Sequence, residues 1–228
     1  MTAKRMLAQL RAVAMILALA AALDAQQTAA PKSAAPPSQP ASAEMQPAAP
    51  RDAAPQQPRP LTVGGKLRYG MEKGFGPGSI VTSFLAAGYQ QAFNHNEGFG
   101  QGAEGYFNRA GSNYGNNAIK GVVGSFALAS IFHQDPRYFR SGHSSFARRL
   151  GHAVSRVLVA RGDNGQAQFN ISKVAGAVSA GLISTRWYQP PDDTVGRGFG
   201  RAGVSLAVSA VTNVLREFWP DIRRKLHH

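Results

Sequence analysis

The chain has 228 residues, with 25 Lys and Arg against 12 Asp and Glu, a formal net charge of +13, and no cysteine. The missing cysteine excludes disulfides, thiol chemistry and Cys-ligated metal sites. The positive charge favours anionic lipid headgroups or acidic envelope polymers as partners over basic ones.

Residues 1–25 have the order of features that is typical of a secretory signal peptide. Lys4, Arg5 and Arg11 are positive, residues 12–23 are apolar, and Ala25 is a small residue at a plausible cleavage point. The apolar run would extend about 18 Å as a helix against about 30 Å of hydrocarbon, so we do not expect a permanent span. We predict an exported protein of the periplasm or the outer membrane surface, for which nucleic acid is not an expected partner.

Residues 26–60 predict a disordered linker rich in Pro, Ala and Gln. They hold nine of the 14 prolines and no Phe, Tyr, Trp, Ile, Leu or Val, so they cannot bury enough apolar surface to become ordered. The linker is either a spacer that holds the domain away from a wall or membrane, or a connection without a specific role. Residues 61–228 then form a single basic domain.

The first part of this domain is rich in glycine. Residues 61–78 predict a Gly-rich loop, and a helix follows from Ser79 as N-cap through Phe93. Residues 94–117 are rich in Gly and Asn, which predicts an irregular loop with a short helix at 101–109.

The second part predicts further helices, the one near residue 172 being capped by Asn170 or Ser172. No long two-residue alternation indicates a sheet. The fold class that we predict is mainly α, a bundle of four or five short, Gly/Ala/Ser-rich helices with long Gly/Asn-rich loops. The further helical segments are residues 118–133, 145–161, 172–184 and 201–218.

Small residues recur at helical spacing beside bulkier ridges. In 172–184, Gly176 with Ala180 and Ala177 with Gly181 form small-xxx-small pairs. Such stripes let helices approach closely, in membranes and in tight soluble bundles alike. Full burial of all faces would indicate a soluble bundle, whereas one bare apolar face would indicate contact with lipid or with a second copy in a homo-oligomer. The last helix carries the bulky ridge Val204, Val208, Val211, Leu215 and Phe218 beside the small stripe Gly203, Ala207 and Ala210.

Four aromatic residues close the apolar segments with arginine nearby. Aromatic and Arg side chains together favour the headgroup level of a membrane. The alternative is that these rings seal helix ends over a soluble core. The four are Tyr138, Trp187, Tyr188 and Trp219.

Segment 145–161 predicts a basic amphipathic helix. Four basic residues share the face opposite to its apolar residues, and we expect them to bind acidic headgroups or a polyanion. Arginine favours this because its planar fork binds phosphate or carboxylate in a bidentate manner. The alternative is a solvated face without a ligand. The four basic residues are Arg148, Arg149, His152 and Arg156.

One polar cluster could carry chemistry. His133 could act as a base, Asp135 as its orienting carboxylate and Arg137 as an anion holder, although Asp-Pro after a helix is also an ordinary stop signal. No HExxH pair, P-loop, dinucleotide fingerprint or G-x-S-x-G elbow is present, so we predict no metal and no cofactor.

The motifs DPRYFR (135–140), RGDNGQAQFN (161–170), WYQPP (187–191) and NVLREFWPDI (213–222) are distinctive. Over residues 61–228 the chain resembles a group of exported bacterial hypothetical proteins. The resemblance implies a domain that also occurs without the linker, and it supplies no catalytic residues. We therefore expect a cell-envelope-associated structural or binding protein. The alternatives are a soluble periplasmic enzyme that uses His133, Asp135 and Arg137, or a soluble polyanion-binding module.

Overall fold

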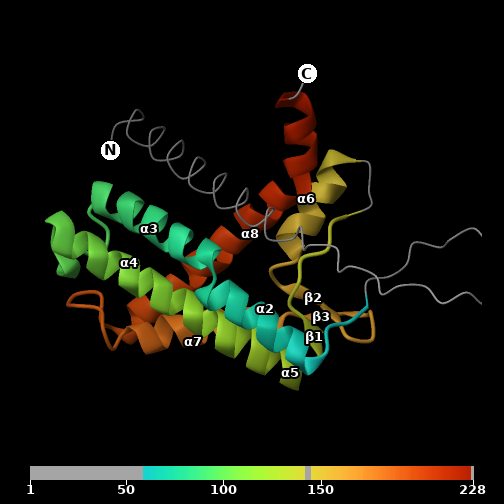
Figure 1. Cartoon of the computed structure of the whole chain (residues 1–228), viewed down its shortest axis with the longest axis horizontal. Helices are drawn as coiled ribbons and strands as arrows, with labels where there is room; N and C mark the ends of the chain where they lie inside the picture. The colour runs from blue at the N-terminus through green and yellow to red at the C-terminus, as the bar shows by residue number, and fades with distance from the viewer. Residues whose placement is uncertain (1–58, 142–144, 227–228) are drawn as a thin grey trace, which may run out of the picture.

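The computed structural model describes residues 59–141 and 145–226 (Figure 1). The predicted signal peptide and residues 26–58 of the predicted linker lie outside these residues. The described part is mainly helical, which confirms the predicted fold class. The helices are α2 (Val63–Phe75), α3 (Pro77–Ala92), the short 3-10 helix η1 (Glu97–Phe99), α4 (Gly102–Ile119), the π-helical segment η2 (Lys120–Leu128), α5 (Ala129–Ile131), α6 (Phe146–Ser155), α7 (Ile171–Ser184) and α8 (Val195–Leu226).

The helices form a bundle around one long rod. Segments α4, η2 and α5 follow one another without a break; α3 packs on α4, α2 and α7 pack on η2, and α8 packs on α7 and α6 (Figure 1). None of the helices in the described residues is long and apolar enough to cross a membrane.

Two glycine-rich segments that predicted loops are helices instead. Residues 63–75 form α2, whose N-cap Thr62 accepts a hydrogen bond from the Gly65 amide at 3.1 Å, and residues 102–119 form α4. The loop predictions are wrong over these residues, although the short helix expected at 101–109 lies within α4. Glycine disfavours a helix in isolation but permits close helix crossing within a bundle.

The glycines lie where helices touch. A methyl group added at Gly70 would lie 2.6 Å from the Gly121 carbonyl oxygen, so the backbones of α2 and η2 are in contact. A methyl group at Gly176 would lie 2.6 Å from the Cα of Gly124. Three glycine pairs mark these crossings: Gly70 with Gly121 between α2 and η2, Gly124 with Gly176 between η2 and α7, and Gly181 with Gly198 between α7 and α8.

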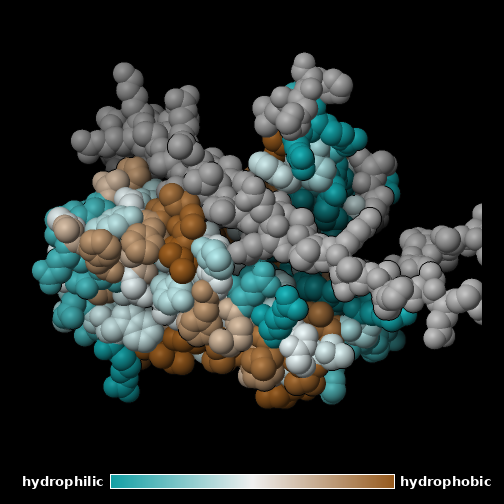
Figure 2. Space-filling model, in the orientation of Figure 1, coloured by the Kyte–Doolittle hydropathy of each residue, from teal (hydrophilic) through white to brown (hydrophobic). Residues whose placement is uncertain are grey.

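Burial in this fold is inverted relative to a common soluble bundle. Small and polar residues fill the interior, and many large apolar side chains face outward, as the brown surface in Figure 2 shows for one face. The exposed apolar residues include a full stripe of α2 at four-residue spacing. The largest fully buried side chains are Arg109, Lys66, Gln134, Glu217, Ser83 and Ser184, and the α2 stripe is Val63, Leu67, Met71 and Phe75.

The ridge of α8 is one of these outward faces. Val204, Val208 and Val211 are 65%, 43% and 42% exposed. Beside them Gly203 is also exposed, and a methyl group there would meet nothing within 4 Å, so the small stripe predicted on this helix is not its packing face. The helix packs instead through a neighbouring arc that carries the buried residues Gly198, Ala202, Asn213 and Glu217.

A small antiparallel sheet, absent from our expectations, closes one end of the bundle. Its strands β1 (Gln134–Asp135), β2 (Val159–Gly162) and β3 (Ala167–Phe169) lie in the order β1-β2-β3. They are too short to show alternation in the sequence. The predicted helix 145–161 therefore ends at Ser155, where the chain turns toward β2.

Buried charges tie these parts together. The Lys66 ammonium of α2 donates to the Ala129 carbonyl at 3.1 Å and to the Asp163 carboxylate at 2.6 Å, which fixes the β2–β3 turn against the bundle. Arg109 of α4 secures the loop before it. The guanidinium donates to the carbonyls of His95, Asn96 and Gly100 and to the side chain of Gln91.

Candidate functional site: a basic cavity

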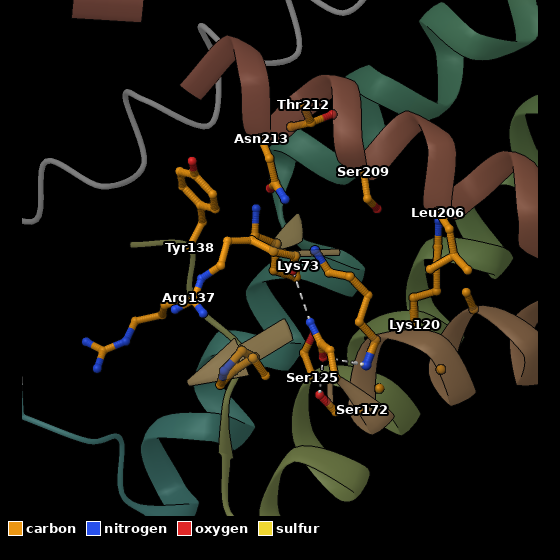
Figure 3. A pocket seen from close by; sticks show the side chains of 18 of the residues that line it. Lys73, Lys120, Ser125, Arg137, Tyr138, Ser172, Leu206, Ser209, Thr212 and Asn213 are labelled. Atoms are coloured by element: carbon orange, nitrogen blue, oxygen red, sulfur yellow. Dashed lines mark hydrogen bonds between the residues drawn. The ribbon is translucent and has the colours of Figure 1, made fainter. Parts of the chain in front are cut away.

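A cavity of about 270 Å³ lies between α2, η2, α7, α8 and the small sheet (Figure 3). Three lysines and four arginines line it, and no Asp or Glu of the described residues does. Such a concentration of one charge sign along one cavity wall is unusual. The seven are Lys73, Lys120, Lys173, Arg137, Arg156, Arg161 and Arg216.

Each wall of the cavity supplies cations from a separate element. Lys73 comes from α2, Lys173 from the first turn of α7 and Arg216 from α8. Lys120 is the first residue of the π-helical segment, and π-helical geometry is rare and frequent at functional sites. Gly121, Gly124 and Gly176 also line the space, so the close helix crossings form part of its wall.

Neutral hydrogen-bonding groups complete the lining. Ser209 and Asn213 of α8 point toward the space in which Lys73 and Lys120 lie (Figure 3). The side chain of Asn170 accepts a hydrogen bond from the Lys173 amide at 3.1 Å, so Asn170 caps α7. This confirms one of the two predicted caps. The cap fixes the first turn of α7 and with it the position of Lys173.

Two of the lysines hold their protons less tightly than a lysine that is exposed to water. Burial lowers the pKa of Lys120 to about 8. Burial also lowers the pKa of Lys173 to about 8, with a further contribution from the nearby positive charges of Lys73 and Lys120. Within the described residues neither lysine has a salt bridge to a carboxylate, and Lys120 donates to the Ser205 hydroxyl at 3.3 Å. An anion between them would restore their preference for the charged form.

The arginines differ in their environments. Burial lowers the pKa of Arg216, and burial followed by the nearby charge of Arg161 lowers that of Arg156, although the Tyr138 hydroxyl opposes this. Arg137 instead has an internal partner, because its guanidinium lies 2.6 Å from the Asp135 carboxylate, and this hydrogen bond raises its pKa. The charge of Arg137 is therefore largely balanced from within the protein.

The structure pairs two residues of the predicted catalytic cluster, Asp135 and Arg137, and places the third, His133, beside Asp163 instead. Of His133, Asp135 and Arg137, only Arg137 lines the cavity. The side chain of His133 is 83% exposed, and its Nδ1 lies 3.7 Å from the Asp163 carboxylate. Asp135 is paired with the guanidinium of Arg137 and not with the imidazole. The described residues contain no group of three or more His, Asp or Glu that could hold a metal.

The predicted basic face of segment 145–161 is divided between several partners. Arg148 is exposed, whereas Arg149 lies 3.1 Å from the buried Glu217 carboxylate and 2.6 Å from Asp221. The ring of His152 hydrogen-bonds the Phe139 carbonyl at 3.0 Å, and Arg156 lines the cavity. The four residues therefore do not present one common surface.

The Glu217 carboxylate explains why Arg149 turns inward. Burial alone would raise the pKa of Glu217, but hydrogen bonds from the Ser141 amide, the Tyr138 hydroxyl and Arg149 outweigh it and lower the pKa. The Tyr138 hydroxyl donates to the carboxylate at 2.8 Å and the Ser141 amide at 3.0 Å. This buried ionic network holds α6 against α8 beside the cavity.

The four aromatic residues predicted for a membrane interface lie at different depths. Tyr138 is half-buried and bound to Glu217, and Trp187 and Trp219 are half-buried. Tyr188 is only 6% exposed, and the guanidinium of Arg201 stacks 4.1 Å from its ring centre. The ring of Tyr188 thus packs inside the fold rather than on an outer surface.

Sequence reasoning missed the three lysines of the cavity because they lie on three separate helices. One signal was available. Lys120 and Lys173 each stand alone in an otherwise small and apolar segment, and each precedes by three or four residues a glycine of the packing face, Gly124 or Gly176. A lone cation on the small face of a helix indicates a charge that points into the bundle.

Comparison with protein-family models, with characterised proteins and with solved structures finds no match to this chain. The resemblance drawn from the four motifs remains a prediction. The chemistry of the cavity itself therefore indicates what the protein binds.

Proposed function

We propose that the protein is an envelope-associated binding protein that holds a phosphorylated group in its basic cavity. The observation that carries this proposal is the lining of three lysines and four arginines without any Asp or Glu of the described residues. A phosphate group suits this lining because it offers several acceptor oxygens and more than one negative charge to converging ammonium, guanidinium and hydroxyl donors.

The absence of carboxylates from the described cavity wall argues against a purely structural role for these lysines. Where this protein uses buried charge for structure it supplies a partner, as with Lys66 and Asp163 or with Arg149 and Glu217. Lys120 and Lys173, which are half-buried, have no such partner in the described residues, and partial desolvation of an uncompensated cation costs free energy. A bound anion would offset that cost.

The size of the cavity favours a discrete anionic group over a long polyanion. A space of about 270 Å³ accommodates one or two phosphate groups, whereas a polymer requires an open basic groove. The soluble polyanion-binding module is therefore the weaker alternative, and nothing in the geometry favours an enzyme that uses His133 and Asp135.

The envelope association is supported by two features outside the cavity. The N-terminal sequence has the pattern of an export signal, and the domain exposes apolar faces on α2 and α8 that are larger than single scattered residues. Together with the net positive charge, these faces suit an anionic lipid surface, with a second copy of the chain as the other candidate partner.

Calorimetric titration of the full-length chain with inorganic pyrophosphate tests the proposal. The double variant Lys120→Met/Lys173→Met should bind pyrophosphate at least ten-fold more weakly than the wild type. The matched control Lys225→Met/Arg148→Met removes the same charge from exposed positions and should bind within two-fold of the wild type. Equal weakening in both double variants, or no saturable binding to the wild type, would refute the proposal, with circular dichroism confirming that all variants are folded.

A further inference from the structure

Helix α8 joins the cavity to an exposed apolar ridge. At about 100° per residue, Ser205, Ser209 and Arg216 fall on one arc of the helix, and all three line the cavity. Val204 and Val211 fall on the adjacent arc, which is exposed.

Val208 stands at the boundary of these two arcs. It lines the cavity and is also 43% exposed, and it lies one helical turn from Val204 and one from Val211. A ligand that leaves the cavity past Val208 therefore meets an apolar surface and not a polar one.

We infer that the ligand of the cavity is a phosphorylated lipid, whose charged head lies near Lys120, Lys173 and Arg216 and whose hydrocarbon chain lies along Val204, Val208 and Val211. This inference rests on the proposed function, since it names the ligand class of the same site. Charge complementarity selects the head, and continuity of the cavity wall with the apolar ridge selects the chain.

A free phosphate would leave the apolar ridge without a role. Exposed valines at this spacing cost little when single, but three on one ridge form an apolar strip that water covers unfavourably. The arc beside the ridge is polar and faces the cations of the cavity, because Lys120 of η2 donates a hydrogen bond to Ser205 on this arc of α8. The two arcs together match a molecule that is anionic at one end and apolar at the other.

Three soluble probes separate the head from the chain. Lysophosphatidic acid below its micelle concentration carries both, glycerol 3-phosphate carries the head without a chain, and lysophosphatidylcholine carries a chain with a zwitterionic head. The full-length protein should bind lysophosphatidic acid at least ten-fold more tightly than it binds either of the other two probes. Burial of about two methylene groups would suffice for that factor.

A variant of the valine ridge then tests whether the hydrocarbon chain of the lipid lies along α8. Val204→Ser/Val211→Ser, which leaves the cavity-lining Val208 in place, should lose the ten-fold preference for lysophosphatidic acid and keep its affinity for pyrophosphate within two-fold. The control Val195→Ser/Phe199→Ser changes exposed apolar residues of the same helix that do not line the cavity, and should keep the preference.

The failures of the two proposals are distinguishable. Equal affinity of the wild type for lysophosphatidic acid and glycerol 3-phosphate, with pyrophosphate binding intact, overturns the lipid inference alone. A ridge variant that turns an oligomer into a monomer without affecting the lipid preference also overturns it, because the ridge is then an interface between copies. No pyrophosphate binding to the wild type overturns both.

Discussion

Charged side chains fall into two groups according to whether the fold supplies a counter-charge. Lys66 and Arg149 are paired with carboxylates, and Arg109 is surrounded by carbonyl oxygens. Lys120 and Lys173 face other cations across the cavity. Single-residue patterns in the sequence could not distinguish these groups, because the partner of each cation comes from a distant segment. The free protein therefore carries an electrostatic cost at the two lysines that a ligand could offset.

The two lysines make a pH dependence that can be measured without any ligand. Their pKa is about 8 in the fold, against 10.5 for a lysine that is exposed to water, so the unfolded state binds more protons between these values. The cost of burying the two charges is fully present below about pH 8. The free energy of unfolding should rise as pH increases from about 8 toward 10.5, because stability rises with pH where the unfolded chain holds more protons.

Urea denaturation at pH 7.5, 8.5 and 9.5 provides the measurement. The wild type should gain stability relative to Lys120→Met/Lys173→Met over this range, and its affinity for pyrophosphate should fall over the same range. The double variant serves as the reference for all other groups that titrate there. Parallel stability profiles of the two proteins would show that these lysines are not perturbed.

At the scale of the helix, glycine has a role opposite to the one expected from propensity. The expected helices over 79–93, 172–184 and 201–218 are present, and the small pairs of 172–184 are buried as their spacing indicates. Segments 61–78 and 94–117 predict loops because their glycines look like breakers in isolation. The crossing partner that makes Gly70 favourable is Gly121, which lies far along the chain. The π-helical geometry at Lys120 has no local sequence signal either.

Two helical glycines with opposite surroundings test this explanation. In Gly176→Ala the added methyl group would lie 2.6 Å from the Cα of Gly124, so backbone must move. We expect a net loss of about 1–3 kcal/mol in the free energy of unfolding, since overpacking outweighs the helix propensity of alanine. In Gly111→Ala of α4 the methyl group meets nothing within 4 Å, and we expect a gain of about 0.5–1 kcal/mol.

Chemical denaturation of both alanine variants beside the wild type supplies the comparison. Opposite signs of the change are the expected result. If Gly176→Ala were as stable as Gly111→Ala, the helices would not be held at backbone contact and the account of the bundle would be wrong.

At the scale of the molecule, the proposed function depends on where polar and apolar side chains lie. Small and polar groups line the interior and the cavity, while large apolar side chains face outward on α2 and α8. Part of the ridge of α8 is exposed, and the proposed contact with lipid depends on this ridge. The expectation of an anionic partner comes from composition alone, and composition could not indicate the cavity, because the cavity forms only where four helices and the sheet meet.

A crystal structure of the protein soaked with tungstate tests the central claim most directly. Tungstate is a phosphate-sized dianion whose anomalous scattering locates it without ambiguity. The account predicts an anomalous peak inside the cavity, within hydrogen-bond reach of the ammonium groups of Lys120 and Lys173. Tungstate found only on exposed arginines such as Arg148, with the cavity free of it, would contradict the claim that this space is built to bind an anion.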